Sequence, residues 1–191
     1  MPSKLKQTAT VTRSPKKVSD LMRINPHFRR SVQVELDYKD PRSTTGYIAT
    51  EFVVHCFDRI RQAFSKNSTQ RSWRLTGDYG SGKSAFTLTL AKAACGKSKE
   101  IPPCLRGKIQ CELEPVFVTG EREPLHETIG KAIIKQSPWM KRRAVPTNAA
   151  ELIELVENVH DLSSKGIFLI LDELGKNLEH AMMEPASSDV Y

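Results

Sequence analysis

The chain has 191 residues, of which 39% are hydrophobic and 27% charged, and its formal net charge is +7. This length leaves room for one domain with a sizeable core, and the composition is that of an ordinary globular protein. No apolar run approaches the ~18–20 residues that cross a bilayer, and residues 1–17 lack the apolar stretch of a secretory signal, so we expect a cytoplasmic protein.

The first predicted part is a flexible basic tail over residues 1–20. Five lysines and arginines lie within residues 1–17, which hold no acidic residue, so the rest of the chain carries only +2 of the net charge. Such a tail is typically solvated. The alternative is that it contacts nucleic acid or another acidic partner.

Residues 21–70 form the second predicted part, an N-terminal arm and a helix. Ser31–Asp37 alternates apolar and polar residues, which predicts an extended arm or edge strand. Thr45–Phe64 carries apolar residues at helical spacing, which predicts an amphipathic helix that packs on the core. The candidates for its N-cap are Ser43, Thr44 and Thr45.

Residues 71–191 form the third part, and it opens on a phosphate-binding pattern. Gly77–Ser84 reads GDYGSGKS and fits the Walker A pattern of Gly, any four residues, Gly, Lys and Ser or Thr. A predicted strand, Ser72–Thr76, precedes the loop and a predicted helix, Ser84–Ala94, follows it, as the motif requires. Glycines let backbone N–H groups approach an anion, and the helix N-terminus attracts it. We expect nucleotide contacts from Gly77, Asp78, Tyr79, Gly80, Ser81, Gly82, Lys83, Ser84 and Ala85, with Lys83 on the β- and γ-phosphates and Ser84 on Mg²⁺.

Further along the chain, strands and helices alternate. Pro115–Thr119 is apolar and predicts a buried strand, and helices are predicted over Leu125–Gln136 and Asn148–Asp161. Alternation of this kind predicts an α/β fold with a mainly parallel sheet and right-handed crossovers.

A second motif follows these helices. The apolar run over residues 167–171 predicts a strand that is buried on both faces, and a short helix is predicted over Leu174–Met183. Asp172 lies where the strand ends, which is the edge at which α/β sheets bind ligands. We interpret Asp172 as a Mg²⁺ ligand and Glu173 as the general base that polarises the attacking water.

The two motifs together resemble the P-loop ATPases that carry Asp-Glu at Walker B, a group that includes AAA+ and related signalling ATPases. The resemblance implies an αβα sandwich, ATP with Mg²⁺ and hydrolysis to ADP. It also makes Tyr47 and Ile48 candidates for contact with adenine, although core packing is the simpler role for both. The segment Asp172–His180 (DELGKNLEH), together with Leu75–Ser84 (LTGDYGSGKS), is similar to the N-terminal ATPase region of large bacterial proteins, some of which are linked to defence against phage.

The same resemblance implies elements that the sequence does not supply. P-loop ATPases of this group have further strands after Walker B, a polar sensor residue, an arginine finger and a helical lid. We therefore expect the chain to be the N-terminal part of a longer ATPase, incomplete after Walker B, with slow turnover and an exposed strand edge. Because an exposed strand edge can pair with another strand, we expect self-association or contact with other domains of the longer chain.

Three functions remain open from the sequence. The first is an ATPase module that couples hydrolysis to a conformational change, and Glu173 favours it, since a pure binding module needs no base. The second is a nucleotide-binding regulatory module with little turnover. A small-molecule phosphotransferase is third, because the residues between the motifs show no set of arginines for an acceptor.

Overall fold

The computed structural model describes residues 17, 22, 31–64, 68–109, 111, 113–137, 140, 143–162 and 165–183. The chain divides into two units, Met1–Ser31 and Val32–Tyr191, and all the helices and strands described below belong to the second. The predicted basic tail lies outside the described residues apart from Lys17, so its role stays a prediction.

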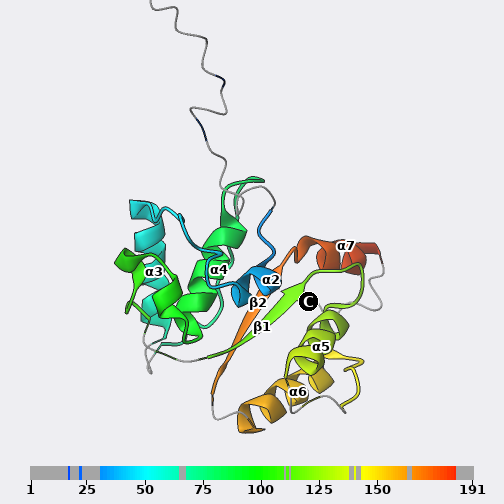
Figure 1. Cartoon of the computed structure of the whole chain (residues 1–191). Helices are drawn as coiled ribbons and strands as arrows, with labels where there is room; N and C mark the ends of the chain where they lie inside the picture. Colours follow the sequence, from blue (N-terminus) through cyan, green and yellow to red (C-terminus); the bar gives the residue numbers. More distant parts are fainter. Residues whose placement is uncertain are drawn as a thin grey trace, which may run out of the picture. The chain divides into compact units, whose positions relative to one another are not determined.

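The described part of the second unit is mixed α/β, with six α-helices and one two-stranded sheet (Figure 1). The mixed α/β character and all five elements predicted after residue 100 are confirmed. Two 3₁₀ turns, Ser98–Glu100 and Pro103–Leu105, connect α4 (Lys83–Ala94) to β1 (Glu114–Thr119). In chain order the other elements are α2 (Val34–Lys39), α3 (Glu51–Ala63), α4 (Lys83–Ala94), β1 (Glu114–Thr119), α5 (Leu125–Gln136), α6 (Ala149–Leu162), β2 (Ile167–Asp172) and α7 (Gly175–Met183).

The two strands are parallel and pair from Glu114 opposite Ile167 to Thr119 opposite Asp172. Parallel neighbours require a crossover, and here α5 and α6 supply it. Both strands therefore end at the same edge of the sheet, where the chain turns into Gly120 after β1 and into Glu173 after β2.

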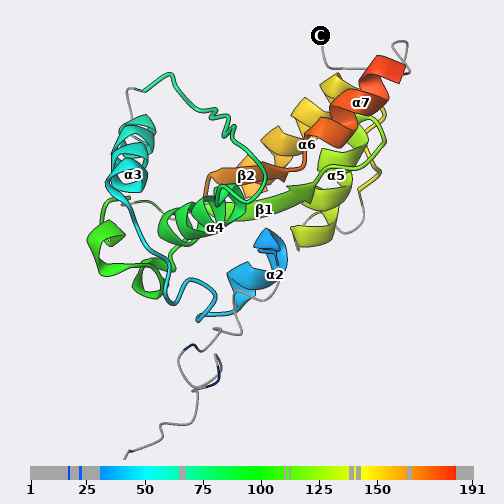
Figure 2. The same cartoon turned by 90° about the horizontal axis from the view of Figure 1, so that it is seen from above.

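Each face of the sheet packs against a different pair of helices (Figure 2). Val116 and Val118 of β1 point to α5 and α6, whereas Phe117 and Ile170 point to α4 and α2. The first core also contains Ile129, Ile133, Met140, Leu155 and Val159, and the second contains Val34, Leu88 and Ala91.

The prediction that β2 is buried on both faces is wrong for one face. Leu169 and Leu171 are 37% and 39% exposed, whereas Ile170 between them is buried. The cause is that α5 packs over β1 rather than over β2. Part of the apolar run is therefore open to solvent.

The two edges of the sheet differ. The Gln136 side chain closes the β1 edge, because its Oε1 accepts from the Phe117 N–H at 2.9 Å and its Nε2 donates to the Phe117 carbonyl. The Gly166 and Asp172 carbonyls accept hydrogen bonds from the Glu114 and Gly120 N–H groups. The backbone N–H and C=O groups of the even-numbered residues of β2 therefore point toward β1. The N–H and C=O groups of Leu169 and Leu171 point outward, where no further strand lies among the described residues.

The prediction of an extended arm at Ser31–Asp37 is wrong, since α2 begins at Val34. Asp37 Oδ2 accepts a hydrogen bond from the Gln33 N–H at 2.9 Å, which closes the first turn of the helix. Val34 is buried against α4 and the sheet. The alternating apolar and polar residues of this segment therefore lead into a helix that buries Val34 and do not form a strand.

The helix predicted over Thr45–Phe64 begins six residues later, at Glu51. Its N-cap is Thr50, whose hydroxyl accepts from the Val53 N–H at 3.3 Å, and not Ser43, Thr44 or Thr45. Gly46 has a φ of +83°, which breaks a helix at that point. Phe52, in the first turn of α3, is 75% exposed, so it does not belong to the buried stripe of the helix.

The strand predicted at Ser72–Thr76 is absent. Residues 68–78 have no regular structure, and the segment runs as an irregular connection between α3 and α4 (Figure 2). Only Trp73 is held in the core, with the Arg59 guanidinium 5.7 Å from its ring centroid. A strand forms when a neighbour accepts and donates its backbone hydrogen bonds, and no described strand pairs with this segment.

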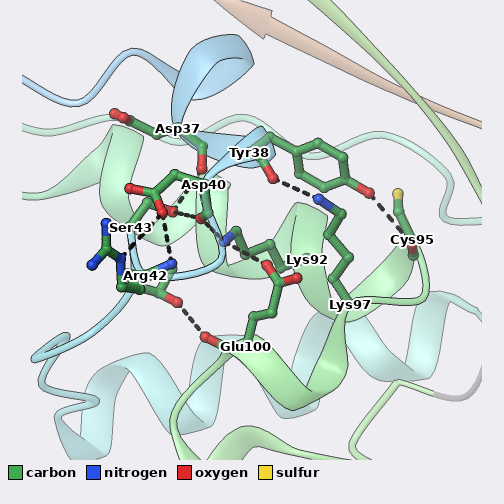
Figure 3. A network of polar contacts seen from close by, with 10 residues as sticks. Asp37, Tyr38, Asp40, Arg42, Ser43, Lys92, Cys95, Lys97 and Glu100 are labelled. Carbon is green, nitrogen blue, oxygen red and sulfur yellow. Dashed lines mark hydrogen bonds and ion pairs between the residues drawn. The ribbon is translucent and has the colours of Figure 1, made fainter.

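A polar network joins α2 and the turn after it to α4 and the first 3₁₀ turn (Figure 3). Its centre is Lys92, which is fully buried and donates to the Asp40 carbonyl at 2.7 Å and to Glu100 Oε2 at 2.8 Å. Lys97 Nζ donates to the Tyr38 carbonyl at 2.8 Å and lies 4.2 Å from the centroid of the Tyr38 ring. The network fixes the N-terminal part of this unit against α4.

Candidate functional site

The backbone of the Gly77–Ser84 loop depends on two glycines. Gly80 and Gly82 have φ angles of +79° and +84°, in the left-handed region that only glycine adopts at little cost. A Cβ atom on either glycine would meet no atom within 4 Å, so the dihedral angle and not the space requires glycine there. The Gly82 carbonyl accepts from the Phe86 N–H at 2.9 Å, and α4 starts directly at the loop.

Lys83 folds back over the same loop. Its ammonium group donates to the Gly77 carbonyl at 2.8 Å and to the Asp78 carbonyl at 2.9 Å. An ammonium group has three donors, and no carboxylate pairs with this one in the part of the chain that the structure describes. The positive charge is therefore held at the loop without being neutralised.

The first turn of α4 contains no negatively charged side chain that could pair with the N-terminus of the helix. Its cap residue, Gly82, has no side chain to accept a hydrogen bond, and the first turn contains no acidic residue. The N–H groups at the start of a helix have no partner within the helix, and the helix dipole adds about half a positive charge there. The N–H groups of Lys83, Ser84 and Ala85 thus face no carboxylate from the first turn of the helix itself.

The direction of α4 brings this loop toward the end of the strands. Ala94 accepts from the Leu113 N–H at 2.9 Å just before β1, whereas Leu88 packs against the middle of the sheet. Going back from Ala94 to Lys83 covers about 16 Å of helix, and going from Leu113 to the end of β1 covers about 20 Å of strand. The start of α4 and the end of β2 therefore lie toward the same end of the unit (Figure 1).

The turn after β2 has an unusual backbone. Glu173 has a φ of +56°, and it is the single non-glycine residue with positive φ among those described. Such a conformation costs on the order of 1–3 kcal/mol and is concentrated at functional sites. The Asp172 carboxylate supports it, because Oδ1 accepts from the Glu173 N–H at 3.1 Å.

Gly120 and Asn177 hold this turn in place, and neither was among the predicted site residues. Gly120 donates to the Asp172 carbonyl at 2.7 Å, and a Cβ atom on it would lie 2.2 Å from the Glu173 carbonyl oxygen. Asn177 is buried and donates to the Glu123 carbonyl at 2.9 Å and to Thr128 Oγ1 at 2.8 Å. The loop after β1 and the turn after β2 are thereby joined, with no room for a side chain at position 120.

Ser84 and Asp172 suit the metal that was predicted for them. A hydroxyl and a carboxylate are the hard oxygen donors that Mg²⁺ prefers, and Mg²⁺ commonly takes few ligands from the protein. The described residues contain no group of three or more His, Cys, Asp and Glu side chains that could hold a metal ion.

The two candidates for contact with adenine have different surroundings. Tyr47 packs against the core between α3 and α4, and burial raises the pKa of its hydroxyl to about 12. Ile48 is 80% exposed, so core packing is wrong for this residue. Contact of either residue with a base stays a prediction.

Comparison with known proteins gives no match: no protein-family model, curated protein or solved structure matches the chain. No helix in the described ranges has the length and apolar character to cross a membrane. The functional assignment therefore depends on the loop, the start of α4 and the turn after β2.

Proposed function

We propose that the chain is the nucleotide-binding part of a Mg²⁺-dependent P-loop ATPase, built on an αβα sandwich. The observation that carries the proposal is the conformation of Gly77–Ser84. Two left-handed glycines lead into a helix whose N-terminus has no capping side chain, and Lys83 closes over the loop. A loop of this kind binds the phosphate groups of a nucleotide.

In this proposal the loop binds the phosphates through its backbone. The N–H groups from residues 80–85 donate to phosphate oxygens, and the Lys83 ammonium group exchanges the carbonyls of Gly77 and Asp78 for the β- and γ-phosphates. A charged hydrogen bond to a phosphate is stronger than one to a neutral carbonyl, so the exchange is favourable when ATP arrives.

In this proposal, residues at the turn after β2 carry out the hydrolysis step together with Ser84. Ser84 and Asp172 would hold Mg²⁺, which neutralises charge on the phosphates. Glu173 accepts a proton from a water molecule as the water oxygen forms a bond to the γ-phosphorus. The bond between that phosphorus and the β–γ bridging oxygen breaks, and the products are ADP and inorganic phosphate.

A nucleotide-binding regulatory module with little turnover is the second candidate. One observation favours it: the segment that leads into the loop, residues 68–76, is not held by any described strand. Without a paired strand, the leading segment is held mainly by Trp73 and Arg71, so the loop positions the γ-phosphate less firmly, and misplacement of reacting groups slows the chemistry.

The open edge of β2 supports the proposal that this module associates with other protein. Leu169 and Leu171 are partly exposed there, beside outward-pointing backbone groups that another strand would satisfy. The partner is a second copy of the chain or a further domain.

Replacing Lys83 by alanine tests the nucleotide site. We expect the Kd of Mg·ATP to rise about 10- to 100-fold, because hydrogen bonds to charged groups contribute roughly 1.5–3 kcal/mol. Isothermal titration calorimetry measures the change, with Lys99→Ala, an exposed lysine beyond the end of α4, as the control that keeps wild-type affinity. Equal Kd values for wild type and Lys83→Ala would refute the Walker A assignment.

A further inference from the structure

The side chain of Glu173 has one ion-pair partner among the described residues. Lys176 Nζ contacts Glu173 Oε2, and the side chains of the two residues are 48% and 54% exposed. The other carboxylate oxygen, Oε1, has no hydrogen-bond partner in the described ranges. The lysine thus fixes one oxygen of the proposed base and leaves the second one available.

The position of Lys176 is not explained by the stability of α7. The residue lies in the first turn of that helix, which starts at Gly175 and has no acidic residue in this turn. A cation at a helix N-terminus is unfavourable because of the helix dipole. An exposed ion pair at spacing i,i+3 stabilises a protein very little. A role in the site accounts better for a lysine at this point.

The backbone around the pair is rigid, whereas the glutamate side chain by itself is not. Gly120 and Asp172 hold the Glu173 backbone, and the Lys176 N–H donates to the Glu173 carbonyl at 3.1 Å. A half-exposed glutamate has three rotatable side-chain bonds and samples several rotamers in water. Among the described residues, the contact with Lys176 is the side-chain interaction that favours one of these rotamers.

We propose that Lys176 is a positioning residue for the ATPase reaction: it holds Glu173 Oε2 so that Oε1 faces the attacking water. This inference rests on the proposed function, because it assumes that Glu173 is the general base. It assigns to Lys176 an effect on the rate of the chemical step and none on the binding of ATP.

Single-turnover hydrolysis of γ-labelled Mg·ATP, with protein in excess over ATP, tests the inference in five proteins. They are the wild type, Lys176→Met, Lys176→Arg, Glu173→Gln and the control Lys135→Met, which removes an exposed lysine on α5 that pairs with Glu35. We expect Lys176→Met to lower the single-turnover rate about tenfold, since loss of orientation acts on the rate. Lys176→Arg restores at least half of the wild-type rate, and Lys135→Met equals the wild type.

Calorimetry with Mg·ATP separates positioning from folding and binding. Lys176→Met is expected to bind ATP with a Kd within twofold of the wild type, which a misfolded variant would not do. A Lys176→Met rate equal to or above that of the wild type overturns the inference, as does a Lys176→Arg variant that is as slow as Lys176→Met.

Failure of the proposed function gives a different result. If the wild type and Glu173→Gln release phosphate equally, or if neither releases any, the assignment of Glu173 as the base is wrong, and the role of Lys176 is wrong with it. If Glu173→Gln is inactive while Lys176→Met matches the wild type, only the role of Lys176 is wrong.

Discussion

Replacing Glu173 by glutamine is expected to lower the rate of ATP hydrolysis about 10²- to 10⁴-fold, the usual contribution of a general base. Glutamine has the same shape as glutamate but does not take a proton from water at neutral pH. The Gly120 and Asp172 contacts to position 173 involve only its backbone, so they are retained in the variant. The affinity for Mg·ATP should therefore stay within about threefold of the wild type, because the phosphate contacts come from residues 77–85.

Phosphate release measured in parallel with ATP binding checks this expectation. Glu179→Gln is the matched control, since Glu179 is an exposed glutamate on α7 that pairs with Arg122 at 3.3 Å. It should hydrolyse ATP at the wild-type rate. A Glu173→Gln variant that releases phosphate as fast as Glu179→Gln would contradict the assignment of the base.

Replacing Lys92 by methionine is expected to lower the free energy of unfolding by about 2–4 kcal/mol. The ammonium group is fully buried, and its removal leaves the Glu100 carboxylate without this donor, whereas the Asp40 carbonyl still accepts from Ser43 (Figure 3). Breaking a buried pair from one side costs roughly 3–5 kcal/mol. We expect less, because the Glu100 side chain is 22% exposed and water screens part of its charge.

Urea unfolding of three variants measures this loss. The double variant Lys92→Met with Glu100→Gln should recover part of the lost stability, because no unpaired buried charge remains. Lys108→Met, which breaks a more exposed pair with Asp58 at 2.9 Å, should cost only about 1 kcal/mol or less. If Lys92→Met unfolds at the same urea concentration as Lys108→Met, the buried network does not fix the N-terminal part of this unit.

The elements that the sequence predicted well are those with strong local signals. β1, α5, α6, β2 and α7 are defined by apolar residues at the spacing of a strand or a helix, and their ends agree with the prediction within one residue. The helix after the loop was also predicted, because the helix has to follow the glycines for the motif to bind phosphate.

The predictions that were wrong concern features set by side-chain and tertiary contacts, which the alternation of apolar and polar residues does not show. Ser72–Thr76 alternates like a strand, but a strand also needs a neighbour, and pairing cannot be read from five residues. Ser31–Asp37 alternates as well, yet a carboxylate at position 37 closes a helical turn instead. The exposure of Leu169 and Leu171 depends on where α5 packs, which is a tertiary effect.

The candidate site shows the same division. The loop and the Asp172-Glu173 pair are contiguous in sequence, so their residue types and spacing were enough to find them. Gly120 and Asn177 are 57 residues apart in the sequence, and only the fold brings them to the same turn. A glycine directly after β1 was the one sequence signal for a close backbone approach at that point.

We propose above all that Gly77–Ser84 binds the phosphates of ATP through its backbone N–H groups. The amide chemical shifts of these residues measure such binding most directly. In a ¹H–¹⁵N correlation spectrum, titration with Mg·ATP should shift the amide signals of residues 80–85 most strongly, since these N–H groups receive the phosphate oxygens. Adenosine, which has no phosphate, should leave the same signals in place. Amide signals of residues 80–85 that do not move at millimolar Mg·ATP, or that move equally with adenosine, would contradict the claim.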